Sequence, residues 1–206
     1  MYKSNDGRSK GLNILVGMSG GVDSSTAALM LKEQGHKVIG VTMAIYRGKL
    51  NTTTSYKCGG ACYGPDEKED IEAARNICNQ IGIDYYVFDC VEKYNEIVLE
   101  KFKKEYLSGR TPNPCVWCNS LIKFDVLPRI ARLNGIEFDK FATGHYARIE
   151  EEDGRYILKR GKNPKKDQSY FLYRLKQEQL KNILLPLGDY TKEEIRKRAE
   201  KCGLAV

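Results

Sequence analysis

Short apolar runs alternate with amphipathic stretches through the first two thirds of the chain. Four runs rich in branched aliphatic residues have the length of buried parallel strands. They lie at residues 13–16, 37–43, 83–88 and 139–143. Between them, apolar residues recur at the spacing of amphipathic helices. These stretches lie at residues 23–34, 65–81, 94–107 and 121–133. Strands that alternate with helices predict an α/β fold with a doubly wound, mostly parallel sheet.

The pattern changes in the last third of the chain. Residues 148–160 are typical of a β-hairpin, with Asp153-Gly154 as a two-residue turn. Two more helical patterns follow, at residues 177–185 and 191–202. We therefore expect a main domain over residues 1–150 and the start of a second, smaller unit over residues 151–206.

A glycine-rich turn joins the first predicted strand to the first predicted helix. It reads SGGVDS at residues 19–24. Glycines let backbone N–H groups approach a ligand, and a helix N-terminus favours an anion. Asp23, Ser24 or Ser25 is suited to cap that helix. The turn lacks the Lys of a Walker loop. It resembles the pyrophosphate loop of the N-type ATP pyrophosphatases, which bind ATP and adenylate an oxygen of their substrate.

Composition limits the class of protein. With 206 residues, 41% of them hydrophobic and 30% charged, the chain is of ordinary globular type. The N-terminus lacks an apolar signal segment, and no apolar run approaches membrane-spanning length. We therefore expect a cytoplasmic protein with no membrane partner. Its seven cysteines would stay reduced there, which disfavours a disulfide framework.

Positive charge is concentrated near the C-terminus. The net charge is +7, and residues 155–201 hold 14 Lys or Arg against 6 Asp or Glu. Residues 1–154 hold 20 against 21. A near-neutral body with a basic C-terminal quarter suggests a polyanionic partner such as nucleic acid. A solvated basic surface is the alternative.

Four motifs occur in one order along the chain. They are GMSGGVDSS at residues 17–25, GRTPNPCVWCN at 109–119 with IKF at 122–124, ATGHY at 142–146, and KDQSYFLY at 166–173. Together they resemble the tRNA-specific 2-thiouridylases of the MnmA/TrmU family, from about residue 12 to the end of the chain. The resemblance implies a sheet of the adenine nucleotide alpha hydrolase type. It also implies that residues 151–206 begin a small, basic, tRNA-binding domain.

The resemblance further implies an activity. Members of this family use ATP, with Mg²⁺, to adenylate the carbonyl oxygen of the wobble uridine in tRNA. A cysteine persulfide then supplies sulfur, and AMP leaves. We therefore expect an ATP-dependent tRNA-uridine 2-sulfurtransferase, with tRNA and a sulfur donor such as a cysteine desulfurase relay as partners. This fits the chemistry, because a carbonyl oxygen is a poor leaving group until it is adenylated.

The functional residues of the family carry over motif by motif. Those expected to bind ATP are Gly17, Met18, Ser19, Gly20, Gly21, Val22, Asp23, Ser24, Met43 and Gly144. Those expected to contact tRNA are Asn113, Pro114 and Cys115 at the target base, and His145, Lys166, Asp167 and Gln168 elsewhere. Cys118 is the expected nucleophile, and a position at the start of a helix would make its thiol reactive.

The cysteines depart from the family pattern. Cys115 stands where the best-known members carry Asp, and it forms a C-x-x-C pair with Cys118. Cys58 and Cys62, on an irregular loop at residues 47–64, could complete a zinc site of four thiolates. Alternatively, three of the four could hold an iron–sulfur cluster. The competing hypothesis is that Cys118 acts alone and Cys115 only fills the aspartate position.

The length of the chain is the second departure. In the family, the persulfide-forming cysteine and a β-barrel domain follow the helix that here ends at Gly203, whereas the chain stops at Val206. Three explanations stay open: the chain is a fragment, the gene is truncated, or this is a short form that relies on another sulfur carrier. A fragment should keep ATP binding but lose turnover through two cysteines. Two other functions also stay open. The protein could thiolate a small-molecule acceptor, or it could be a non-catalytic module that binds ATP and tRNA.

Overall fold

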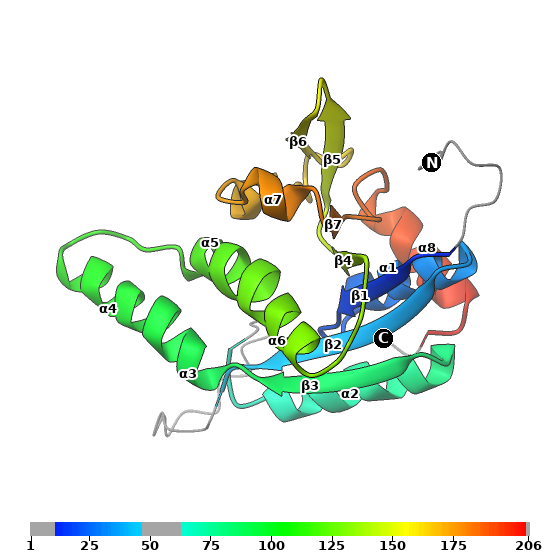
Figure 1. The fold of residues 1–206 in the computed structure, drawn as a ribbon, viewed down its shortest axis with the longest axis horizontal. Helices are drawn as coiled ribbons and strands as arrows, with labels where there is room; N and C mark the ends of the chain where they lie inside the picture. The colour runs from blue at the N-terminus through cyan, green and yellow to red at the C-terminus, as the bar shows by residue number, and fades with distance from the viewer. Residues whose placement is uncertain (1–10, 47–62, 205–206) are drawn as a thin grey trace.

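Five parallel strands form one sheet in the computed structural model, which describes residues 11–46 and 63–204 (Figure 1). The strand order is β3-β2-β1-β4-β7. The strands are β1 (Asn13–Gly17), β2 (Lys37–Ala44), β3 (Asp84–Asp89), β4 (Lys140–Thr143) and β7 (Ile183–Leu184). Ile14 pairs with Val38 of β2 on one side and with Lys140 of β4 on the other. The predicted doubly wound parallel sheet is therefore confirmed.

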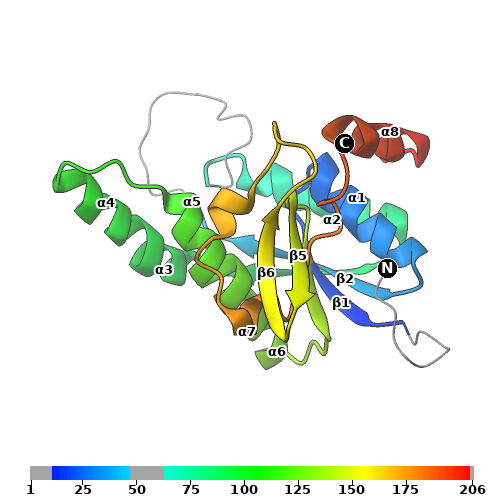
Figure 2. The same ribbon diagram turned by 90° about the horizontal axis from the view of Figure 1, so that it is seen from above.

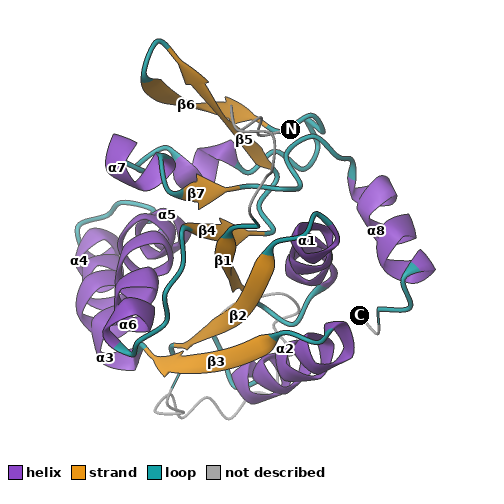
Figure 3. Ribbon diagram, turned by 45° about the vertical axis from the view of Figure 1, so that its right-hand side comes forward, coloured by secondary structure: helices purple, strands orange, loops and turns teal. Residues whose placement is uncertain are grey.

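Helices cover both faces of this sheet (Figure 3). One face carries α1 (Val22–Glu33), α2 (Glu67–Ile81) and α8 (Lys192–Lys201). The other face carries two composite helices. The first consists of α3 (Val91–Tyr94), η1 (Asn95–Leu99) and α4 (Glu100–Leu107). The second consists of α5 (Pro114–Trp117), η2 (Cys118–Val126) and α6 (Leu127–Leu133). Because strand residues alternate between faces, Ile14 and Val16 join the first core and Leu15 joins the second. None of the described helices is long and apolar enough to cross a membrane.

The predicted hairpin is present and stands apart from the sheet. β5 (Ala147–Glu152) and β6 (Arg155–Arg160) pair antiparallel, with Asp153 and Gly154 at positive φ in the turn. A 3₁₀ turn, η3 (Ser169–Leu172), and the short α7 (Gln177–Leu180) follow. Seen from above, α4 and α8 lie at opposite ends of the molecule (Figure 2).

The helix predicted at residues 177–185 is wrong beyond its first turn. α7 ends at Leu180, and Ile183 and Leu184 form β7 beside β4. A short apolar run fits a strand as well as a helix, and Pro186 prevents a helix from continuing. The segment forms a strand because the side of β4 that faces away from β1 offers backbone hydrogen-bonding groups. The N–H of Phe141 donates to the carbonyl of Asn182 there.

Two helices on the second face begin earlier than predicted. The helix predicted to start at residue 94 begins at Val91, and the one predicted to start at residue 121 begins at Pro114. Residues 114–120 were not part of the predicted helix. Instead Pro114 takes the first helical position, where its missing N–H is not needed, and the side chain of Asn113 accepts a hydrogen bond from the N–H of Cys115 at 3.2 Å.

Candidate functional site

The chain reverses its direction across the sheet at β1. From β1 it passes to β2 on one side, whereas β4 lies on the other side. Ligands of open α/β sheets bind at the carboxyl ends of the strands at such a point. Gly17 ends β1 and is paired with Thr143, which ends β4. The glycine-rich turn follows Gly17 directly, so the topology places it at the expected crevice.

Two glycines bring bare backbone into this crevice. Gly20 has φ of 75°, and a Cβ built on it would lie 2.6 Å from the carbonyl oxygen of Asp70. Gly144 follows β4, and its Cβ would lie 2.7 Å from both the carbonyl carbon of Asp23 and the nitrogen of Ser24. Any larger residue at position 144 would push the segment after β4 away from the first turn of α1.

Serine and threonine hydroxyls hold the turn in shape. The Ser24 hydroxyl accepts from the N–H of Ser19 at 3.1 Å and donates to the carbonyl of Gly21 at 3.2 Å. Thr42 Oγ1 on β2 donates to the carbonyl of Met18 at 2.9 Å. The predicted side-chain cap is absent, because Gly21 is the N-cap of α1 and no side chain bonds the first-turn N–H groups. An uncapped helix N-terminus is suited to hold an anion.

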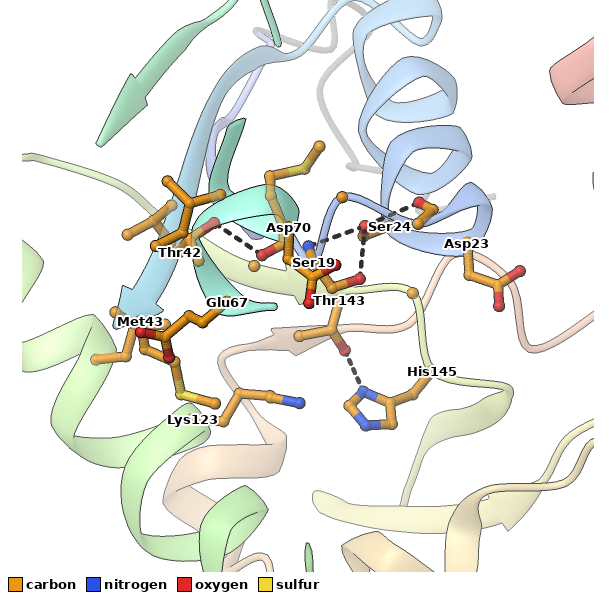
Figure 4. A pocket seen from close by; sticks show the side chains of 18 of the residues that line it. Ser19, Asp23, Ser24, Thr42, Met43, Glu67, Asp70, Lys123, Thr143 and His145 are labelled. Atoms are coloured by element: carbon orange, nitrogen blue, oxygen red, sulfur yellow. Dashed lines mark hydrogen bonds between the residues drawn. The ribbon is translucent and has the colours of Figure 1, made fainter. Parts of the chain in front are cut away.

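A cavity of about 490 Å³ opens beside this turn (Figure 4). Of the residues expected to bind ATP, all but Val22 line it. His145 and Gln168, expected to contact tRNA, line the same cavity. Eight further residues line the cavity that were not expected to bind a ligand: Val41, Thr42, Glu67, Asp70, Ile71, Lys123, Leu127 and Thr143. Lys123 and Thr143 lie within the IKF and ATGHY motifs. The other six come from elements outside the motifs, so no local pattern indicated them.

Two carboxylates from α2 form the acidic side of the cavity. Glu67 accepts hydrogen bonds from the N–H groups of Ile45, at 2.7 Å, and Tyr46, at 3.1 Å, and so fixes the chain where β2 ends. Burial raises the pKa of Glu67 above its usual range despite these bonds. The pKa of Asp70 is also raised, first by burial and then by the negative charge of Asp66.

A lysine and a histidine form the opposite side. Lys123, on η2, extends into the cavity between Met43 and His145 (Figure 4). His145 Nδ1 lies 2.7 Å from the hydroxyl of Thr143. Burial lowers the pKa of His145 to about 3, with help from the positive charge of Lys123. His145 is therefore neutral at physiological pH, which makes it a hydrogen-bonding group and not a cation for phosphate.

Asp23 has partners from two distant segments. Its Oδ1 accepts from the hydroxyl of Tyr146 at 2.7 Å and from Nζ of Lys192 at 2.6 Å. The backbone of Tyr146 is in turn paired with Gln168, through the Tyr146 N–H to Gln168 Oε1 and the Gln168 N–H to the Tyr146 carbonyl, both at 2.9 Å. These bonds tie the ATGHY and KDQSYFLY motifs to the glycine-rich turn at residues 19–24.

The other residues expected to contact tRNA lie outside the cavity. Lys166 is exposed. Asp167 orders the turn before η3, because its carboxylate accepts from the N–H groups of Gly161 and Ser169 and from the Ser169 hydroxyl. Asn113 and Pro114 form the start of α5.

The structure corrects the expected position of Cys118. The helix begins at Pro114, so Cys118 lies one turn inside it and not at its start. Its side chain is 8% exposed and packs in an apolar cluster with Trp117 and Cys90, outside the cavity. Cys115 is exposed. Burial raises the pKa of the Cys90 thiol to about 12, with smaller effects from Asp89 and Cys118.

The four-cysteine metal site stays a prediction. Cys58 and Cys62 lie outside the described residues. Within residues 11–46 and 63–204, no three His, Cys, Asp or Glu side chains are arranged to hold a metal ion.

Comparison with curated proteins finds relatives named tRNA-specific 2-thiouridylase MnmA. Those from Endomicrobium trichonymphae, Clostridium botulinum (strain Alaska E43 / Type E3) and Geotalea uraniireducens are 48%, 48% and 47% identical to this chain. The alignments cover 94%, 94% and 100% of this chain, and 54%, 51% and 53% of the relatives. The chain thus spans about half the length of the curated relatives it matches.

Two solved structures share the fold. A "predicted subunit of tRNA methyltransferase" from Methanocaldococcus jannaschii has a TM-score of 0.50 and 14% identity, over 92% of this chain and 74% of that one. The NMN synthetase from Francisella tularensis also has a TM-score of 0.50 and 14% identity, over 94% and 62%. At this identity the likeness concerns the fold alone, and it agrees with the expected doubly wound, mostly parallel sheet.

A family model described as the tRNA methyl transferase HUP domain matches residues 12–206. The matched range includes the phosphate loop and the three other motifs. The chain therefore belongs to the tRNA methyl transferase HUP domain family.

Proposed function

We propose that the protein thiolates the wobble uridine of tRNA to 2-thiouridine, using ATP. The observation that carries the proposal is the cavity beside the glycine-rich turn, which is lined by residues of all four sequence motifs. Curated relatives at 48% identity are named 2-thiouridylases, which supports the choice of reaction. The whole activity is proposed for the protein that carries this chain.

ATP fits the cavity through its phosphates. The uncapped N-terminus of α1 and the close approach at Gly20 and Gly144 offer backbone N–H groups to an anion. Met43, at the end of β2, is available to contact the adenine ring. Mg²⁺ would be shared between the phosphates and cavity carboxylates, of which Asp70 and Asp23 are candidates. The ion would offset phosphate charge during adenylation.

The proposed reaction begins with two displacements. The O2 oxygen of uridine attacks the α-phosphorus of ATP, the bond to the β-phosphate breaks, and pyrophosphate leaves. The terminal sulfur of a persulfide then attacks C2, and AMP leaves with the former carbonyl oxygen. These two displacements leave the base joined to the carrier cysteine through an S–S bond. The Cys118 thiolate then attacks the carrier sulfur, which breaks that bond, releases 2-thiouridine and forms a disulfide between Cys118 and the carrier that an external thiol reduces. Neutral His145 and the Lys123 ammonium are available to position the reacting groups, because both line the cavity.

Cys118 remains the proposed nucleophile. Because its side chain is buried beside Trp117, the start of the composite helix at Pro114 must open before sulfur can reach the cavity. An iron–sulfur cluster or zinc held by Cys115, Cys118, Cys62 and Cys58 is a separate proposal. Metal and acid-labile sulfide analysis after anaerobic purification, with Cys115→Ala as the comparison, tests it.

Two partners are proposed, tRNA because of the basic C-terminal quarter and a sulfur donor because the reaction consumes sulfur. Exposed Lys165 and Lys166, in the basic C-terminal quarter, are proposed to bind the tRNA backbone. A cytoplasmic cysteine desulfurase relay is proposed as the sulfur donor.

Mass spectrometry of nucleosides from tRNA tests the function directly. Cells that lack the gene should lose 2-thiouridine at the wobble position, and the wild-type gene should restore it, whereas Asp23→Ala should not. Unchanged 2-thiouridine in the deletion strain would contradict the proposal. Restoration by Cys118→Ser would favour the second candidate, a non-catalytic module that binds ATP and tRNA, which the burial of Cys118 also favours.

A further inference from the structure

We infer that Lys192 is a positioning residue of the phosphate loop, which neutralises Asp23 so that an incoming triphosphate meets an electropositive helix end. The inference rests on the proposed binding of ATP. It assigns a role in the nucleotide site to α8, an element that none of the four motifs includes.

The contact between Lys192 and Asp23 is short and sheltered. Nζ of Lys192 lies 2.6 Å from Oδ1 of Asp23, and the Lys192 side chain is only 17% exposed. The hydroxyl of Tyr146 donates to the same oxygen at 2.7 Å. Burial and the adjacent Asp23 carboxylate raise the pKa of Tyr146, so its hydroxyl keeps the proton it donates. One carboxylate oxygen is thus held by a cation and a hydroxyl.

The start of α8 is fixed, so Lys192 does not reach Asp23 by chance. Thr191 and Glu194 form a reciprocal capping box at the first turn of α8. Ile195 is fully buried in a cluster with Ala27 of α1 and Tyr146. At the far end of α8, Arg198 pairs with Glu33, the last residue of α1. Two ion pairs and an apolar contact therefore hold α8 along α1.

The charge of Asp23 makes this pairing functionally relevant. Asp23 lies in the first turn of α1 and lines the cavity. An unbalanced carboxylate there would repel the phosphates that the helix N-terminus attracts. With Lys192 in contact, the Asp23–Lys192 pair carries no net charge. Asp23 then does not oppose the attraction between the first-turn N–H groups of α1 and the phosphates.

Equilibrium binding of ATP, measured by calorimetry in EDTA, tests the inference without turnover or a metal ion. Lys192→Met should weaken ATP binding by about five- to twentyfold, as expected for one unbalanced charge near the phosphates. Lys192→Arg should stay within about twofold of wild type, because it keeps the charge. Lys197→Met, an exposed lysine on the same helix, is the matched control and should bind ATP like wild type.

The decisive measurement is a double-mutant cycle with Asp23→Asn. Once Asp23 has no charge, Lys192→Met should no longer weaken ATP binding, because nothing is left to neutralise. The double variant also carries no unpaired charge and should fold even if Lys192→Met alone does not. An equal loss of affinity in both backgrounds, or no loss in either, would overturn the inference while leaving ATP binding intact. If the wild type binds ATP only with Mg²⁺, the same cycle is measured with Mg²⁺. A wild-type protein that binds no ATP either in EDTA or with Mg²⁺ would instead refute the proposed function, and this inference with it.

Discussion

At the scale of residues, the phosphate loop could be predicted and its surroundings could not. The loop is a local signal, because a strand, two glycines and a helix start are adjacent in sequence. Lys192 and Asp23 are 169 residues apart, and only packing of α8 on α1 brings them together. Glu67, the first residue of α2, was not among the expected site residues, yet its carboxylate accepts a hydrogen bond from the N–H of Ile45 directly after β2.

Gly144 gives the sharpest prediction at this scale. Gly144→Ala would place a Cβ 2.7 Å from backbone atoms of Asp23 and Ser24, and it should displace the first turn of α1. ATP binding should weaken by roughly tenfold or more, a loss that corresponds to about 1.4 kcal/mol. Gly64→Ala is the control, since no atom lies within 4 Å of its added Cβ. ATP affinity that is equal in the two variants would contradict the close approach at Gly144.

His145 should make stability depend on pH. Its pKa is about 3 in the fold against 6.5 in an unfolded chain, so below pH 6.5 only the unfolded chain takes up this proton. Stability from this source should fall as the pH drops from 6.5 toward 3, by about 1.4 kcal/mol per pH unit at most. Above pH 6.5 the residue should have no such effect.

Urea unfolding of wild type and His145→Gln across this pH range checks the sign. The raised pKa values of Glu67 and Asp70 act in the opposite direction, but they are present in both proteins and cancel in the difference. The wild type should lose stability relative to His145→Gln on acidification. Parallel curves would mean that His145 is protonated equally in both states.

At the scale of elements, strands and helices with long, clear periodicity were predicted, and short ambiguous ones were not. The four strands β1 to β4 and the hairpin follow from apolar runs and an Asp-Gly turn. β7 has two residues, and only its place beside β4 distinguishes it from helix. The start of the helix at Pro114 was missed because proline breaks a helix interior but fits its first position, and the sequence pattern does not show which applies here.

The burial of each cysteine in the fold predicts which thiols react with an alkylating reagent. Cys115 and Cys202 are exposed, whereas Cys118, Cys90 and Cys78 are buried. Burial also raises the thiol pKa values of Cys78 and Cys90 to about 12, which leaves little thiolate. Among the five cysteines of residues 11–46 and 63–204, brief iodoacetamide treatment of the native protein should label Cys115 and Cys202 before the other three, as read by peptide mass spectrometry. Labelling of Cys118 as fast as Cys115 would show that the helix start opens readily without substrate.

At the scale of the whole molecule, the charge distribution could be read from the sequence but its relation to the fold could not. The basic C-terminal quarter was expected to begin a separate unit at residue 151. In the structure this part of the chain adds β7 to the main sheet, packs α8 on α1 and lines the cavity through Gln168. Such sharing depends on tertiary contacts that no composition shift reveals. The boundary near residue 150 stays a prediction.

Salt dependence tests the basic surface. If Lys165 and Lys166 contact phosphates, replacing both with Ala should reduce the slope of log affinity for tRNA against log salt by about one to two units. Lys37→Ala, an exposed lysine at the amino end of β2 and so at the end of the strands away from the cavity, should leave the slope unchanged. An unchanged slope in the double variant would place the tRNA elsewhere or point to a small-molecule acceptor.

The central claim is that the cavity beside the phosphate loop uses ATP to adenylate tRNA. The most direct measurement identifies the nucleotide products, with ATP labelled at the α- or the γ-phosphate and with tRNA present or absent. The account predicts pyrophosphate and AMP, released only with tRNA, and neither from a folded Asp23→Ala variant. Release of ADP and phosphate, or pyrophosphate release at the wild-type rate by folded Asp23→Ala, would contradict it.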